Sequence, residues 1–212
     1  MSEFYDKDYY ENGTCTGKSC YVNYRWMPEL TIKLAYNLIR HLNLNEHDTL
    51  LDYGCAKGYL VKALRILDVD AFGCDSSRYA INTVDSEVRD FCYNIEDRDN
   101  IISQNYDWLM TKDVLEHMTE NDIDQLLIES SKKVRKMFHV IPLGIKNGEF
   151  VIQEYHDDPS HIQIQTKKWW TEKFNNHGWE VVSFSYKVNG IKSNWTEKYE
   201  KGNGFFTLRR KK

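Results

Sequence analysis

A short apolar strand that runs through a glycine-bounded turn into a helix is the sequence feature that most limits the fold. Residues 49–52 read Thr-Leu-Leu-Asp, and Gly54 ends the apolar run. A helix is predicted next, over about 58–67, with an inward face of Leu60, Val61, Leu64 and Leu67. Strand, turn and helix in this order begin a βαβ unit, whose parallel strands are covered by helices.

The same alternation continues along the chain. The apolar patterns predict helices from Pro28 (Leu30, Leu34, Leu38 and Ile39 inward), from Arg78, over 119–131 with a Thr119 cap, and over 166–177. They predict further strands at 71–74, 88–92, 106–111, 137–143, 179–186 and 205–208, the last two joined by a polar loop over 189–203. We therefore predict an α/β fold of three layers, with a mostly parallel seven-stranded sheet and an antiparallel C-terminal hairpin strand.

Residues 1–27 lack a clear period and are rich in aromatic side chains, so we expect an N-terminal extension or lid there. Residues 28–212 are expected to form one domain, because no linker, repeat or composition change interrupts them.

Charge and cysteine content narrow the class of protein. The net charge is −4 and the one dense basic run is 209–212, which disfavours a nucleic-acid partner and leaves it as an alternative. No segment approaches the roughly 20 apolar residues of a membrane span, and the N-terminus lacks a signal-peptide pattern. Five cysteines, an odd number without a CxxC pair, predict free thiols and a cytoplasmic location.

Acidic residues stand at the ends of the first two predicted strands. Ligands of parallel α/β sheets bind at the carboxyl ends of the strands. Gly54 and Gly58 allow close backbone approach after the first strand, and Asp75 at the end of the second can accept hydrogen bonds from a ribose diol. Asp52 lies before the glycines, where it would repel a dinucleotide pyrophosphate but suit an ammonium or sulfonium group. The pattern favours a positively charged nucleoside cofactor over NAD.

Four blocks of the sequence resemble, in order, the signatures of class I S-adenosylmethionine-dependent methyltransferases, a Rossmann-like family. They are residues 50–58, 73–76, 106–117 and 179–184, within a resemblance that covers about 28–186. The most specific block is 107–117, Asp-Trp-Leu-Met-Thr-Lys-Asp-Val-Leu-Glu-His, which is similar to the family's fourth strand and Leu-Glu-His turn. The resemblance implies S-adenosylmethionine as cofactor.

The resemblance also implies roles for individual residues. Asp52 and Gly54 would line the methionine moiety, Asp75 would bind the ribose hydroxyls, Asn94 and Ile95 would lie by the adenine, and Asp113 would lie near the reactive end. Tyr53, Cys55, Gly58 and Ser76 complete the predicted cofactor-binding set. The chain departs from the family pattern at Ala56, where a glycine is common, and at Asn94, where an aspartate is common.

Methyl transfer from a sulfonium is a direct displacement that needs alignment and a base or metal to prepare the acceptor. The candidate catalytic residues are His117, His156, His161 and Asp113. Asp113, Glu116 and His117 would share a face if a helical turn begins there. Ubiquinone-pathway O-methyltransferases and small-RNA 2′-O-methyltransferases look similar at this point and use such a cluster for a divalent ion. By that resemblance Glu116, His117 and His161 could hold Mg²⁺ or another divalent ion; without a metal, the histidines are candidate bases.

The sequence thus predicts an S-adenosylmethionine-dependent methyltransferase. We expect it to methylate an oxygen of a sugar-derived or other small-molecule acceptor. Two alternatives are a divalent-metal-dependent RNA 2′-O-methyltransferase and a non-catalytic partner subunit that binds the same cofactor.

Overall fold

The computed structural model describes residues 2–97, 102, 104–146 and 148–211. The residues group into two compact units, Met1–Ile101 and Ile102–Lys212. The predicted boundary after residue 27 stays a prediction. Among the described residues, none of the helices combines the length and apolar character that crossing a bilayer requires.

Seven strands have the sheet order β3-β2-β1-β4-β5-β7-β6. In the first unit β1 (Thr49–Tyr53), β2 (Asp70–Asp75) and β3 (Cys92–Asn94) are parallel neighbours. In the second unit β4 (Tyr106–Lys112) pairs in parallel with β5 (Val134–Pro142). There β7 (Asn203–Arg210) runs antiparallel to both β5 and β6 (Trp179–Ser185). The predicted fold class is confirmed, including the antiparallel C-terminal strand.

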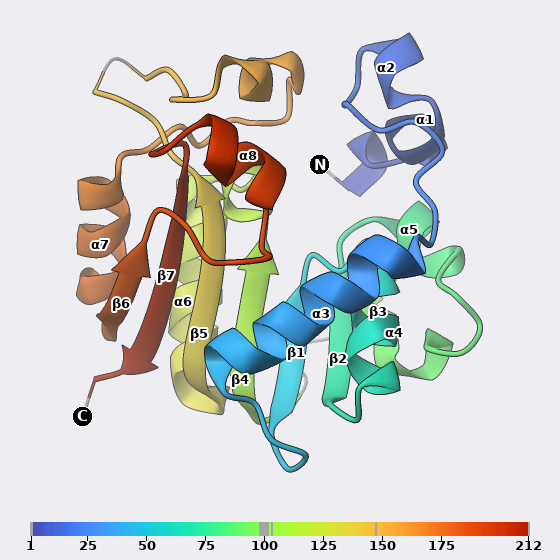
Figure 1. The fold of residues 1–212 in the computed structure, drawn as a ribbon, viewed down its shortest axis with the longest axis horizontal. Coiled ribbons are helices and arrows are strands. Elements are labelled where there is room, and N and C mark those ends of the chain that lie inside the picture. The colour runs from blue at the N-terminus through green and yellow to red at the C-terminus, as the bar shows by residue number, and fades with distance from the viewer. Residues whose placement is uncertain (1, 98–101, 103, 147, 212) are drawn as a thin grey trace. The chain divides into compact units, whose positions relative to one another are not determined.

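The helices of the first unit are α1 (Lys7–Glu11), α2 (Gly13–Thr16), α3 (Pro28–Leu42), α4 (Tyr59–Ile66) and α5 (Arg78–Asn82). The second unit has α6 (Glu120–Lys133), α7 (Lys167–Asn176) and α8 (Ser193–Lys198). In Figure 1, α3 crosses on the viewer's side of β1 and β2, and α6 lies behind β5. Thr119 caps α6 as predicted, since its side chain accepts a hydrogen bond from the Asp122 backbone.

Three predicted details were wrong. The third strand begins only at Cys92, because residues Arg89–Phe91 form a 3-10 turn before the chain joins β2. Leu30, predicted to face inward, is exposed. The buried side of α3 consists of Ala35, Leu38 and Leu42, so burial begins only after the first turns of the helix. The polar loop between the last two strands contains α8, whose short sequence shows no apolar period.

Candidate active site

The turn between β1 and α4 is built from backbone in the left-handed region. Gly54 and Gly58 have φ of 87° and 72°, and Ala56 has φ of 49°. The carbonyl oxygen of Cys74 on β2 accepts hydrogen bonds from the N–H of Gly54 at 2.7 Å and of Cys55 at 3.0 Å. The turn is therefore fastened to the end of β2, and Gly58 stands directly before the first residue of α4.

Asp75 links this turn to the start of α5. One carboxylate oxygen accepts the N–H of Ala56 at 2.8 Å, and the other accepts the N–H of Ser77 at 2.8 Å. Burial raises the pKa of Asp75, and the backbone donors partly offset that rise. A carboxylate has about four acceptor positions, so Asp75 keeps acceptor capacity for a further donor. Asp75 is thus a rigidly held acceptor at the carboxyl end of β2.

Most other predicted cofactor residues lie at the same end of the three parallel strands. Asn94 pairs with Asp75 across β2 and β3, donates to the Ser76 carbonyl at 3.0 Å and accepts the Glu96 N–H at 2.9 Å. Asp52 and Tyr53 are buried near the end of β1, and Ile95 begins a 3-10 turn after β3. The first unit therefore brings the predicted cofactor set together, except for Asp113, which belongs to the second unit.

Residues 1–27 are attached to this turn, a contact that sequence reasoning missed. Lys57, between the two glycines, forms an ion pair with Glu11, which also accepts a hydrogen bond from the Tyr79 hydroxyl at 3.0 Å. The backbone carbonyl of Tyr24 accepts from Lys57 Nζ at 3.2 Å. This anchoring is compatible with the predicted lid. The one feature of the sequence that could have indicated the contact is a lysine inside the glycine turn.

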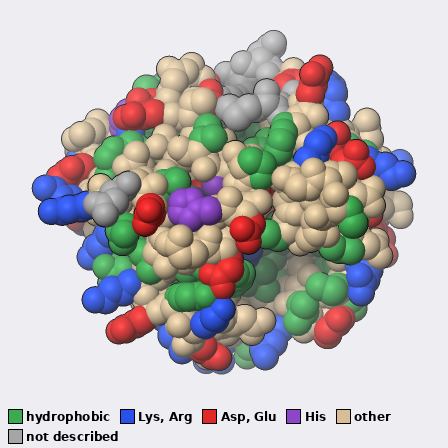
Figure 2. Space-filling view, turned by 90° about the horizontal axis from the view of Figure 1, so that it is seen from above, with side chains coloured by type: hydrophobic (Ala, Val, Ile, Leu, Met, Phe, Trp, Pro, Cys, Tyr) green, Lys and Arg blue, Asp and Glu red, His purple; other side chains and the backbone are tan. Residues whose placement is uncertain are grey.

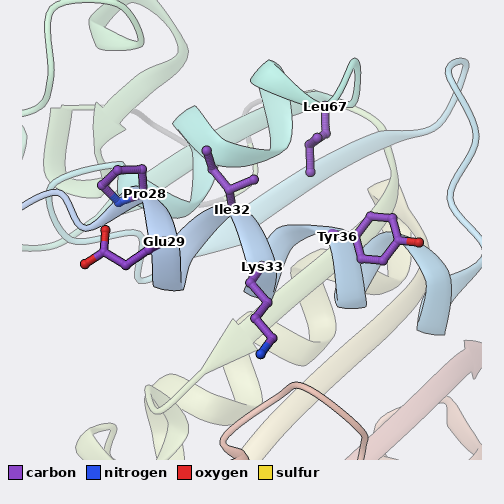
Figure 3. Close-up of a pocket in the computed structure, with 6 residues that line it drawn as sticks. All are labelled: Pro28, Glu29, Ile32, Lys33, Tyr36 and Leu67. Atoms are coloured by element: carbon purple, nitrogen blue, oxygen red, sulfur yellow. The ribbon is translucent and has the colours of Figure 1, made fainter.

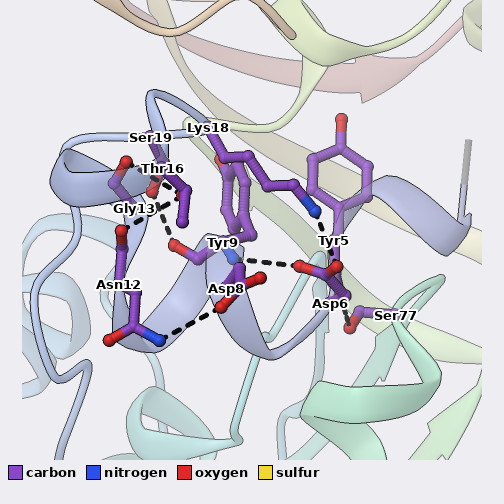
Figure 4. Close-up of polar contacts among 10 residues, drawn as sticks. All are labelled: Tyr5, Asp6, Asp8, Tyr9, Asn12, Gly13, Thr16, Lys18, Ser19 and Ser77. Atoms are coloured by element: carbon purple, nitrogen blue, oxygen red, sulfur yellow. Dashed lines mark hydrogen bonds and ion pairs between the residues drawn. The ribbon is translucent and has the colours of Figure 1, made fainter.

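Aromatic and hydroxyl contacts hold the same segment. Tyr9 and Tyr10 are buried with Ala80, and the partly buried Ala56 packs against this group. Ser77 Oγ donates to the Tyr5 carbonyl at 2.5 Å, as Figure 4 shows together with the internal bonds of the segment. Burial beside the Asp75 carboxylate raises the pKa of the Tyr10 hydroxyl well above its usual range. The segment therefore packs on residues that are next in sequence to those predicted to bind the cofactor.

In the second unit, Asp113 follows β4 with φ of 56°, so it does not begin a helical turn with Glu116 and His117. Its carboxylate lies 2.7 Å from Lys112 Nζ and 2.5 Å from Lys192 Nζ. Although burial alone would raise the pKa of Asp113, these two ammonium groups hold it well below its usual range. The predicted helical face is wrong because the left-handed residue turns the chain.

The Leu115–His117 turn nevertheless brings three predicted ligands together. Potential ligand atoms of Glu116, His117 and His161 all lie within 4.8 Å of one another, and the two imidazole rings are 4.5 Å apart at their centroids. Burial and the neighbouring His161 lower the pKa of His117 to about 4. Figure 2 shows histidine side chains reaching the molecular surface.

Glu116 is the fully buried member of this group. Among the described residues, neither of its carboxylate oxygens has a hydrogen-bond partner. Burial and the nearby Asp113 charge raise its pKa well above the ordinary value. Its backbone carbonyl accepts the N–H groups of Ile162 and Gln163, both at 2.9 Å, which ties the His161 loop to the Glu116 turn. A buried carboxylate without donors requires an explanation.

His156 has a different environment from the other two candidate histidines. It is exposed, and its Nε2 accepts the backbone N–H of Phe150 at 3.1 Å. It is absent from the group of ligand atoms formed by Glu116, His117 and His161.

Sequence reasoning missed a buried chain of polar groups beside Asp113. Lys192 Nζ lies 2.6 Å from the Tyr155 hydroxyl, which in turn donates to Asn203 Oδ1 at 2.9 Å. Burial lowers the pKa of Lys192 and raises that of Tyr155. These residues come from a polar loop, a 3-10 turn and a strand end, so no spacing in the sequence relates them.

A groove of about 480 Å³ lies along α3, away from the predicted site residues. Figure 3 shows its lining, which consists of Pro28, Glu29, Ile32, Lys33, Tyr36 and Leu67.

Comparison with known proteins finds similar structures but no similar sequences. No family model matches the chain, and no curated protein matches it by sequence. The methyltransferase solved with the Haloferax volcanii Trm112 methyltransferase activator is 14% identical, with a TM-score of 0.64 over 88% of this chain and 92% of that one. Magnesium protoporphyrin IX methyltransferase from Synechocystis, with bound SAH, is 12% identical, with a TM-score of 0.59 over 86% and 82%.

A third solved structure is the mitomycin 7-O-methyltransferase MmcR, which is 11% identical with a TM-score of 0.59. The match covers 86% of this chain and 54% of that one, so this chain spans about half its length. The strand order, the antiparallel β7 and these likenesses agree. The chain has the fold of the class I S-adenosylmethionine-dependent methyltransferases.

Proposed function

We propose that this protein is an S-adenosylmethionine-dependent methyltransferase. The observation that carries the proposal is the Asp75 carboxylate, which two backbone N–H groups hold at the end of β2 beside a left-handed glycine turn. The acceptor capacity that remains on this carboxylate suits a ribose hydroxyl. Asp52, buried at the end of β1, adds negative charge that suits a sulfonium and disfavours a pyrophosphate.

In the proposed reaction an oxygen of the acceptor forms a bond to the methyl carbon as the carbon–sulfur bond breaks. The hydroxyl proton leaves the acceptor oxygen, and S-adenosylhomocysteine is the second product. His117 and His161 are the proposed acceptor-activating residues, because their imidazole rings lie together, 4.5 Å apart at their centroids, and an imidazole can accept a proton. Asp113, held by two lysines, has a positioning role in this proposal, and His156 a structural one.

The proposed acceptor is a hydroxyl of a sugar-derived or other small molecule. A net charge of −4 supports it over RNA, since a polyanion is bound through clustered cations. Trp195 is a partly buried ring in the same unit as the histidines, stacked on the buried Tyr155 with 5.3 Å between centroids, and such a ring suits a sugar or an aromatic acceptor. The free thiols of all five cysteines support the proposal of a reducing, cytoplasmic location.

Melting curves with S-adenosylmethionine, S-adenosylhomocysteine and NAD test the cofactor. A ligand at 100 times its dissociation constant stabilises the native state by about 2.7 kcal/mol. We expect stabilisation by the first two, lost in Asp75→Ala but kept in Asp70→Asn, which alters a half-exposed carboxylate paired with Arg65 at the other end of β2. Stabilisation by NAD alone would refute the proposal.

Methyl transfer to nucleotide sugars, small phenols and RNA then tests the acceptor. Turnover on RNA alone would favour the 2′-O-methyltransferase alternative. Cofactor binding without turnover on any acceptor would favour the partner-subunit alternative.

A further inference from the structure

Two cysteine side chains lie close together at the glycine turn of the first unit. Cys55 is buried in the turn itself, and Cys92, which is half-buried, is the first residue of β3. Gly73 of β2 is the direct neighbour of Cys92 across the two parallel strands. Side chains at such paired positions point to the same face of a sheet. The place that a side chain at Gly73 would take therefore lies beside the Cys92 side chain.

The Cys55 side chain occupies that place. A Cβ at Gly73 would lie 2.7 Å from Cys55 Sγ and 2.8 Å from Cys55 Cβ, well inside van der Waals contact. Cys55 thus stands where a cross-strand neighbour of Cys92 would stand. Neighbouring strands are about 4.8 Å apart, close to the roughly 3.5–4.5 Å between the Cβ atoms of a disulfide. A short displacement of the turn would bring the two cysteines into bonding geometry.

The Cys92 sulfur also touches the turn that carries Cys55. A Cβ at Gly58 would lie 3.0 Å from Cys92 Sγ, and the Gly58 N–H donates to the Cys55 carbonyl at 2.9 Å. The adjacent Cys92 thiol, together with burial, raises the pKa of Cys55 well above its usual range. Both thiols are reduced in this structure, and they are neighbours.

We propose that Cys55 and Cys92 are a site of reversible thiol oxidation, whose disulfide ties the glycine turn to β3 and weakens cofactor binding. This inference rests on the proposed function and deepens it, because it concerns the regulation of the same site. Disulfides of cytosolic proteins are usually transient and redox-sensing. Cys74 does not compete for either sulfur, because it follows Gly73 in β2 and points to the opposite face of the sheet.

The oxidant is a low-molecular-weight disulfide such as oxidised glutathione. The Cys92 thiolate attacks one sulfur of this disulfide, the S–S bond of the oxidant breaks, and the first thiol leaves. Cys55 then loses its proton and attacks Cys92 Sγ, so that the internal bond forms as the second thiol leaves. The protein gives up two electrons and two protons, which the two released thiols carry. Cys92 reacts first because it is the more accessible of the two thiols.

The bond acts on the cofactor site through Ala56 and Asp75. Bond formation moves Cys55 towards β3, and Ala56 is the next residue of the turn. The Ala56 N–H donates to Asp75 at 2.8 Å and so orients the carboxylate that is proposed to bind the ribose. Loss of one hydrogen bond to a charged group corresponds to a change in affinity of at least about tenfold.

Peptide mapping tests the bond without any cofactor. The reduced full chain is titrated with oxidised glutathione, and its disulfides are located by mass spectrometry. We expect a Cys55–Cys92 link in the wild type and in the control Cys15→Ser, which removes an exposed thiol. Cys92→Ser should form no link at Cys55, and Cys55→Ala should stop at a glutathione adduct on Cys92. Circular dichroism establishes that each variant is folded.

Calorimetry with S-adenosylmethionine tests the consequence of the bond. The oxidised wild type and Cys15→Ser should bind at least about tenfold more weakly than their own reduced forms, with recovery after dithiothreitol. Cys92→Ser should bind equally before and after treatment with oxidised glutathione.

The proposal is overturned if the folded wild type forms no Cys55–Cys92 link, or if the link forms and the affinity stays the same. Binding by the reduced chain is measured separately and needs no oxidant. A reduced chain that binds S-adenosylmethionine but never forms the link refutes this inference alone, whereas a reduced chain that binds none refutes the proposed function.

Discussion

Lys57 and Glu11 form an ion pair that joins two segments 46 residues apart in the chain. Only 8% of the Lys57 side chain is exposed, and it also lies 5.4 Å from the centre of the Tyr79 ring. Lys57 lies inside the glycine turn, so we expect the conformation of that turn to depend on its contacts with residues 1–27.

Replacing Glu11 by alanine should therefore weaken both stability and cofactor binding. It leaves a largely buried ammonium with poorer partners, which typically lowers the free energy of unfolding by about 1–3 kcal/mol. Calorimetry should also show weaker binding of S-adenosylmethionine. The control, Lys18→Gln, breaks an ion pair within the N-terminal segment itself, with Asp6. Equal effects of the two variants would argue that the Lys57–Glu11 ion pair does not stabilise the glycine turn.

Lys192→Met removes one of the two ammonium groups that neutralise Asp113. Removing one partner of a buried ion pair typically destabilises by about 3–5 kcal/mol, and we expect the lower end because Lys112 still contacts Asp113. Urea denaturation measures this change. Lys198→Met, at the end of helix α8 that follows Lys192, breaks an exposed pair with Glu154 and should change stability by less than about 1 kcal/mol. Similar losses from both variants would contradict the buried-pair interpretation.

His139 should make stability depend on pH. Its Nδ1 is hydrogen-bonded to Thr111 Oγ1 at 2.8 Å, and burial lowers its pKa to about 3. The unfolded chain protonates this histidine below about pH 6.5. Between about pH 6.5 and 3 the unfolded state therefore binds the extra proton, and stability falls as the pH falls, by at most about 1.4 kcal/mol per pH unit.

Urea titrations over this range should give a shallower slope for His139→Gln than for the wild type. The exposed His47→Gln is the control and should keep the wild-type slope. Parallel curves for wild type and His139→Gln would show that His139 does not carry the effect.

Ala56 occupies backbone that favours glycine, with φ of 49°. Left-handed backbone typically costs a residue with a Cβ about 1–2 kcal/mol. Ala56→Gly should thus be neutral or stabilise by up to about 1 kcal/mol, while the β-branched Ala56→Val should destabilise by more than 1 kcal/mol. Thermal denaturation compares the two, and equal stability would contradict the assigned strain.

The sequence was sufficient for most of the fold because apolar periodicity reports burial directly. Strands β1, β2, β4 and β5 are short apolar runs, and each lies close to its predicted position. Helix α8 escaped prediction because Trp195 stacks on Tyr155, which is 40 residues away in the sequence.

The candidate site likewise contains contacts that the sequence could predict and contacts that it could not. Asp75 and the glycine turn follow strand ends, so their proximity could be predicted from the order of strands alone. Glu116, His117 and His161 also come together, although through a 3-10 turn and a loop contact and without the helical face expected for Asp113. The pairs Lys57–Glu11 and Lys192–Asp113 could not be predicted, because charged side chains far apart in sequence pair only after the backbone is placed.

The connection between β6 and β7 holds a constraint for protein engineering. Lys192 lies in that connection and carries the positive charge for Asp113 at the end of β4. Replacing this connection with one from another enzyme, to alter acceptor preference, would leave the Asp113 carboxylate without the Lys192 ammonium group. The new connection would need a lysine or arginine long enough to contact Asp113. Libraries that randomise residues 187–202 should therefore hold position 192 as lysine, and revertants at that position would be the first sign that the graft had failed for electrostatic reasons.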